Sequence, residues 1–160
     1  MVGMRRIAPP KSNAVNELLG KLTSELQGKS YALFETKQKA MMFAAALGFY
    51  RKKRAELEKR DSAKAIDYDI FQRQRDDGFI NALAVAVTED LNVLADERAN
   101  ERIEIFEEYA CAGLQELDEH CFKRPGDPLM ALIKLTEEVN EVSEEVEGFD
   151  KSLLIDLGAY

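Results

Sequence analysis

Residues 37–54 have the sequence KQKAMMFAAALGFYRKKR, and this stretch decides the fold. Its first eleven residues form an apolar helix pattern, in which AMMFAAAL (40–47) is apolar on every face. A helix without a polar face must be buried all round or lie in an interface. Its alanines and the lack of β-branched residues favour the helix and allow close approach of its neighbours. The pattern therefore predicts a buried central helix over residues 37–47, which stops at Gly48 in a left-handed turn.

Amphipathic helix patterns flank this stretch on both sides. Ser12 and Asn13 are good helix caps, and the apolar stripe that follows them contains Val15, Leu18, Leu19, Leu22 and Leu26. Asp76 or Asp77 caps a second helix, whose stripe contains Phe79, Ile80, Leu83, Ala84, Val87 and Leu91.

A long acidic helix follows, from Asp96 to Phe122. Its apolar side contains Ile103, Phe106, Ala110, Leu114, Leu117 and Cys121. Gly113 lies inside this helix, which indicates either a close helix contact or a break. The tetrad Pro125-Gly126-Asp127-Pro128 must end the helix, and it starts a final helix that reaches Val146.

These patterns predict a mainly α fold, a compact bundle of about five helices around the central helix. Ile66, Tyr68 and Ile70 alternate with aspartates, so at most one short extended segment is expected near 66–71. At 160 residues, one domain is the economical expectation. We expect a flexible N-terminal lead over 1–11, a single helical domain over 12–147, and a C-terminal tail over 148–160 that docks on the domain or on a partner.

Composition indicates a cytoplasmic protein that does not enter a membrane. The chain contains no apolar run of about 18 residues, and its N-terminus does not resemble a secretory signal. Cys111 and Cys121 lie ten residues apart in one expected helix, which separates them by about 15 Å. That distance is too long for a disulfide, so both are expected to be free thiols.

The net charge of −8 conceals a strong polarisation along the chain. Residues 1–60 contain 13 Lys/Arg and 5 Asp/Glu, a net charge of +8, whereas residues 61–160 carry −16. We call residues 51–60 the basic segment; its cations are Arg51, Lys52, Lys53, Arg54, Lys59 and Arg60, and Phe49 and Tyr50 precede it. Its positive charge supports three interpretations: a solvated helix end, a surface that binds DNA phosphates or an acidic partner, or a segment that pairs with the acidic remainder of the fold.

Tests for catalytic or metal chemistry are negative. His120 is the only histidine, so neither a catalytic triad with a spare base nor a multi-histidine metal site can be built. The acidic residues match no EF-hand spacing, and Glu35-Thr36-Lys37 lacks the upstream aspartate that a metal-dependent nuclease needs. Neither GxxxxGK nor GxGxxG occurs. We therefore expect no enzyme, no metal site and no cofactor.

Three ordered blocks resemble one known family. They are FAAALGFYRKKR (43–54), IFEEYACAGLQEL (105–117) and KRPGDPL (123–129). The chain resembles the small Dnd-system-associated family, encoded beside bacterial DNA phosphorothioation genes, over about residues 34–135. Where the family has a Tyr-Ala-Asn-Gly-Gly-like run, this chain has YACAG (109–113) and so retains only part of it.

The resemblance implies a place in a modification-restriction (anti-phage defence) cluster, and it supplies no catalytic residues to carry over. We expect a non-catalytic accessory or adaptor protein that contacts DNA or a partner protein of the machinery through the basic segment. The alternative is a small DNA-binding transcriptional regulator of the same cluster, and a hidden enzyme ranks third. The sequence does not determine the oligomeric state.

Overall fold

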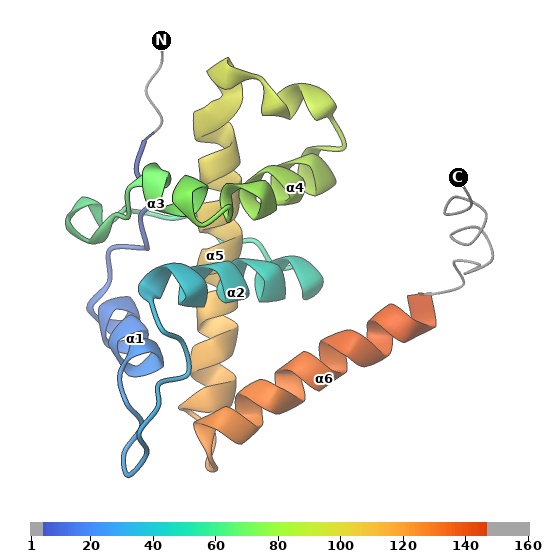
Figure 1. Ribbon diagram of the computed structural model, residues 1–160. Helices are drawn as coiled ribbons and strands as arrows, with labels where there is room; N and C mark the ends of the chain where they lie inside the picture. The colour runs from blue at the N-terminus through green and yellow to red at the C-terminus, as the bar shows by residue number, and fades with distance from the viewer. Residues whose placement is uncertain (1–4, 147–160) are drawn as a thin grey trace. The chain divides into compact units, whose positions relative to one another are not determined.

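The computed structural model describes residues 5–146, and over these residues the fold is all helical, as predicted (Figure 1). The α-helices are α1 (Asn13–Thr23), α2 (Lys37–Tyr50), α3 (Tyr68–Arg73), α4 (Asp77–Thr88), α5 (Ala99–Cys121) and α6 (Pro128–Val146). Three short 3-10 helices are η1 (Ser62–Lys64), η2 (Leu91–Leu94) and η3 (Asp96–Arg98). The chain divides into two units between Glu119 and His120. None of the helices described is both long and apolar enough to cross a membrane.

Side-chain caps hold the starts of α1 and α2, and Ser12 is one of the caps that the sequence indicates. The Ser12 hydroxyl accepts a hydrogen bond from the backbone N–H of Val15 at 3.4 Å, and α1 begins at the next residue, Asn13. The Thr36 hydroxyl accepts one from the N–H of Lys39 at 3.2 Å, at the start of α2. Such caps satisfy N–H groups that have no partner inside the helix. The local chemistry of these two residues therefore places the starts of α1 and α2.

In the first unit, α2 crosses α5 so closely that glycine is required on both helices (Figure 1). A Cβ atom on Gly113 of α5 would lie 1.7 Å from the backbone oxygen of Ala44. A Cβ atom on Gly48 of α2 would lie 2.3 Å from the backbone oxygen of Tyr109. Both distances are far inside van der Waals contact, so only hydrogen fits at these two positions.

These contacts correct one expectation and decide another. Gly48 does not stop the helix, because α2 continues to Tyr50 and Gly48 is buried inside it. The glycine is needed for close approach, whereas the sequence pattern suggested a left-handed turn. Gly113 marks a close helix contact within an unbroken α5, one of the two readings that its position allowed.

The aromatic core of the first unit is centred on Phe106 of α5. Its ring lies 5.9 Å from that of Phe71 in α3 and 6.3 Å from that of Phe79 in α4, both in edge-to-face geometry. Such pairs add specific geometry to the burial of large apolar surfaces. The apolar side predicted for this helix is buried along its length, from Ile103 to Cys121.

The N-terminal residues correct a second expectation, since residues 5–10 are part of the folded unit. Ile7 and Ala8 are fully buried. Ile7 and Ile66 exchange two backbone hydrogen bonds of 2.9 and 2.7 Å, and the N–H of Asp61 donates to the oxygen of Pro9 at 2.9 Å. Extended structure near 66–71 is limited to this bridge, because the chain becomes helical at Tyr68. The tail over 148–160 lies outside the described residues.

The end of α4 corrects a third expectation. The helix stops at Thr88, and Glu89 takes a left-handed conformation with φ of 53°. Leu91, which the pattern placed on the buried stripe, is therefore in η2 and is 73% exposed. The helical periodicity continues in the sequence beyond the point where the helix itself ends.

The glycine contact between α2 and α5 can be tested by adding one methyl group. We expect Gly113→Ala to lower the free energy of unfolding by about 3 kcal/mol, because the two backbones must separate to admit the methyl group. Gly20→Ala is the matched control, since a Cβ atom there meets nothing within 4 Å and alanine should stabilise α1 by about 0.5–1 kcal/mol. Urea unfolding measures both; equal stability of Gly113→Ala and wild type would contradict the close contact.

Candidate interaction site in the basic segment

The path of the basic segment brings its cations to α5. After α2 the chain turns through Lys52, whose φ is 54°, and the N–H of Lys53 donates to the oxygen of Gly48 at 2.9 Å. The N–H of Ala55 then donates to the backbone oxygen of Glu108 at 3.2 Å. A backbone hydrogen bond thus holds the segment against α5, beside the acidic side chains of that helix.

Three cations near the start of the segment form ion pairs with glutamates of α5. Lys53 pairs with Glu116, and Arg54 pairs with Glu108. Arg51 Nε lies 3.9 Å from the Glu116 carboxylate. The side chains of Glu108 and Glu116 are only 12% and 14% exposed, so these pairs are less screened by solvent than ordinary surface pairs.

Arg60, at the end of the segment, pairs with a fully buried carboxylate. Glu107, whose side chain is 2% exposed, accepts from Arg60 Nε at 2.9 Å and from Arg60 Nη2 at 2.5 Å. The same carboxylate accepts from Arg5 Nη2 at 3.2 Å and from the N–H of Ala8 at 2.9 Å. The hydrogen bond to Glu107 raises the pKa of Arg60. Glu107 therefore joins two segments to α5: residues 5–10, which we call the N-terminal strip, and the basic segment.

Lys52 and Lys59 are the two cations of the segment to which the described structure gives no ion pair. Both are exposed, and so are Glu56 and Glu58 on the same segment. The positive charges of the six cations are therefore offset by two glutamates within the segment and by three more on α5. Little net positive charge remains at this surface, and the third interpretation of the segment, pairing inside the fold, accounts for four of its six cations.

The aromatic residues before the segment also make contacts within the first unit. The Phe49 ring packs edge-on against that of Tyr109 at 5.8 Å, although Phe49 remains 42% exposed. The guanidinium of Arg54 lies 5.7 Å from the Tyr109 ring centre, and that of Arg51 lies 5.8 Å from the Tyr50 ring centre. These cation–π contacts add to the ion pairs in fixing the arginines.

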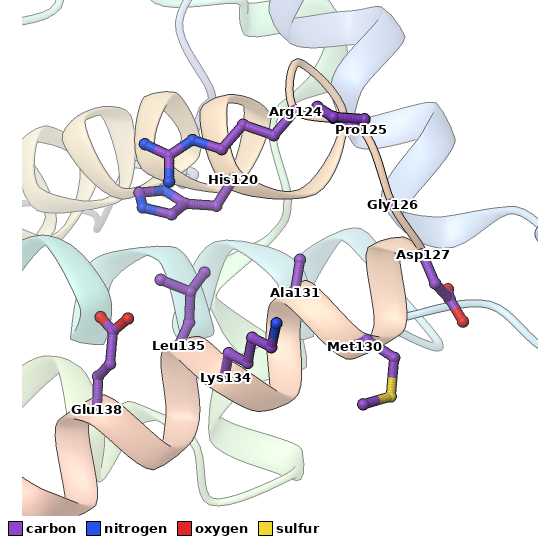
Figure 2. A pocket seen from close by; sticks show the side chains of 10 residues that line it. All are labelled: His120, Arg124, Pro125, Gly126, Asp127, Met130, Ala131, Lys134, Leu135 and Glu138. Atoms are coloured by element: carbon purple, nitrogen blue, oxygen red, sulfur yellow. The ribbon is translucent and has the colours of Figure 1, made fainter.

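A pocket in the second unit contains the single histidine of the chain. The cavity, of about 240 Å³, lies between the end of α5 and the first turns of α6 (Figure 2). Arg124 extends along the His120 ring, and Leu135 and Ala131 line the opposite wall. Lys134 contributes a further cation, whereas Asp127 and Glu138 contribute carboxylates. The charges of this lining balance, so the pocket favours neither an anion nor a cation.

The two cysteines are buried thiols in α5. Burial raises the pKa of Cys111, and it raises the pKa of Cys121 to about 11. A thiol reacts as its thiolate, so both residues are poor nucleophiles at neutral pH. Within residues 5–146, no cluster of three histidine, cysteine or acidic side chains is arranged to hold a metal ion.

The buried carboxylate of Glu107 should control the stability of the N-terminal strip. We expect Glu107→Gln to lower the free energy of unfolding by about 2–3 kcal/mol, because Arg60 and Arg5 lose their shared counter-ion while the shape is kept. Tryptic cleavage after Arg6 should also become faster. Glu58→Gln, an exposed neighbour, is the control; if both variants unfold like wild type, Glu107 is not the anchor.

Thiol burial predicts slow alkylation. At pH 7.5, iodoacetamide should modify the native cysteines at least about 100-fold more slowly than in urea, because a pKa near 11 leaves a correspondingly smaller thiolate fraction for Cys121. Cys111→Ser isolates the Cys121 reaction. Equal rates for native and unfolded protein would show that the thiols are accessible.

Comparison with known proteins places the chain in a family. The family model of DNA sulphur modification system-associated protein 4 matches residues 6–154, nearly the whole chain and more than the span of the resemblance noted in its sequence blocks. No curated protein and no solved structure matches the chain. The match includes α2, the basic segment, α5 and α6. The chain belongs to the family of DNA sulphur modification system-associated protein 4.

Proposed function

We propose that the chain is a non-catalytic accessory protein of a DNA sulphur modification system, and that it acts by binding a protein component of that machinery. The family supplies the link to the modification system. The preference for a protein partner over DNA is supported by one observation, the pairing of the basic segment with the glutamates of α5.

Binding of DNA is driven largely by cations that replace condensed counter-ions along the phosphates. A cation already paired with a shielded carboxylate must give up that pair before it can contribute. Arg51, Lys53, Arg54 and Arg60 are in this position. The rest of a chain with a net charge of −8 repels DNA. A DNA-binding regulator, the alternative function, would face the same electrostatic cost.

Direct DNA binding can be measured with a fluorescent duplex, with and without phosphorothioate linkages. At physiological salt we expect dissociation constants no tighter than about 10⁻⁴ M for both, the weak end of non-specific binding. Tight, salt-sensitive binding that is lost in Lys52→Glu/Lys59→Glu, but kept in the control Lys29→Glu/Lys37→Glu, would contradict the preference for a protein partner. A preference for one promoter would favour the regulator.

The protein partner can be sought in the native host. We expect tagged chain, expressed at its natural level, to co-purify with at least one protein encoded in the same modification gene cluster, in amounts that survive nuclease treatment. Survival after nuclease treatment separates a protein contact from a shared DNA tether. Recovery of no cluster-encoded protein would overturn the proposed function.

A further inference from the structure

The connection between α4 and α5, yellow-green in Figure 1, exposes two leucines. Leu91 is 73% exposed and Leu94 is 42% exposed. They lie at the two ends of η2, whereas Val93 between them is fully buried. The turn is thus anchored through one apolar side chain and displays two others.

The backbone of this turn accepts hydrogen bonds from a buried arginine. Arg102 of α5, which is 5% exposed, donates through Nη1 to the oxygen of Val93 at 2.6 Å and to that of Ala95 at 2.9 Å. At the start of η2, the Asp90 carboxylate accepts from the N–H of Asn92 at 2.9 Å. The turn therefore has a fixed conformation at both ends.

A second arginine bonds to one acid before the turn and one acid after it. Arg98 donates to Asp90 Oδ2 at 2.6 Å, and to the two carboxylate oxygens of Glu101 at 2.7 and 2.8 Å. These hydrogen bonds lower the pKa of Asp90 and of Glu101, so both stay ionised at neutral pH. The only cation between residues 89 and 101 is thus already engaged with two acids.

Three further acids flank the leucines in the sequence. Glu89, Asp96 and Glu97 are exposed, and in residues 5–146 none of them forms an ion pair. The surface consists of two exposed leucines flanked in sequence by uncompensated negative charge, which we call the acidic rim, on a backbone that is held by hydrogen bonds. Pre-organised apolar anchors inside a charged rim are the usual composition of a specific protein contact.

We propose that Leu91 and Leu94, together with Glu89, Asp96 and Glu97, form a docking surface for a protein that presents an apolar pocket rimmed by lysine and arginine. The inference rests on the proposed function and names its contact surface. Charge complementarity selects the partner, because the acidic rim repels nucleic acid and attracts a basic face. Basic faces are characteristic of proteins that bind DNA, so the partner fits the DNA-handling part of the machinery.

The test uses the full chain and each protein encoded in the modification gene cluster, purified and measured singly by biolayer interferometry. At least one should bind. Leu91→Ser/Leu94→Ser should weaken that binding by about 10-fold or more. Asp96→Asn/Glu97→Gln should slow association and reduce its dependence on salt. Met130→Ser/Ile133→Ser removes two other exposed apolar side chains and should change binding less than about 2-fold.

The possible results distinguish failure of the docking surface from failure of the proposed function. If no cluster-encoded protein binds, both are overturned. If one binds wild type and Leu91→Ser/Leu94→Ser equally, the docking surface is wrong and the proposed function stands. If the leucine change only abolishes self-association in sedimentation, the occupant is a second copy and the proposal is overturned. Circular dichroism and melting should match wild type, since both leucines are exposed.

Discussion

The near contact of two helix backbones governs the first unit. Gly48 and Gly113 let α2 and α5 approach until the backbone of one helix touches that of the other. Such an approach fixes the separation of the axes far more tightly than interdigitating large side chains would. It also places the last turn of α2 against α5, so that the chain leaves α2 beside that helix. The basic segment therefore begins where its backbone can bond to α5.

The ion pairs on α5 form because the basic segment runs beside that helix. Glu107, Glu108 and Glu116 receive cations from residues about fifty to one hundred positions earlier in the chain. A half-buried pair contributes less to stability than its distance suggests, because both groups lose hydration. Its larger effect is on specificity, since any other path would leave a shielded carboxylate without a partner. The cations of the first part of the sequence and the acids of the second are therefore paired at short range within the first unit.

Local chemistry could be predicted from the sequence, whereas the pairing of distant segments could not. Ser12 and Pro128 mark helix starts because their effect is confined to neighbouring residues. The role of Glu107 depends on Arg5 and Arg60, which are distant in sequence, and an acidic residue in a glutamate-rich helix gives no sign of its burial. Gly48 was assigned the wrong role because a glycine at a helix end and a glycine at a helix crossing look alike in one sequence.

The candidate sites also depend on contacts and turns that the sequence pattern does not reveal. The six cations of the basic segment stand out in the sequence because they lie within ten residues, whereas their partners on α5 lie far along the chain and do not stand out. Leu91 continues a helical stripe that predicts a core position, because periodicity does not reveal the left-handed turn at Glu89. The acidic residues on both sides of Leu91 and Leu94 were the one available indication of an exposed position.

The buried thiols have a consequence for sulfur chemistry. A cysteine carries transferable sulfur as a persulfide, which requires a thiol that can reach a sulfur donor and ionise. Cys111 and Cys121 are shielded within α5, and burial favours their protonated form. The two cysteine sulfur atoms are thus packed among the buried side chains of the helical core. Persulfide formation at either one would require the buried side of α5 to open first.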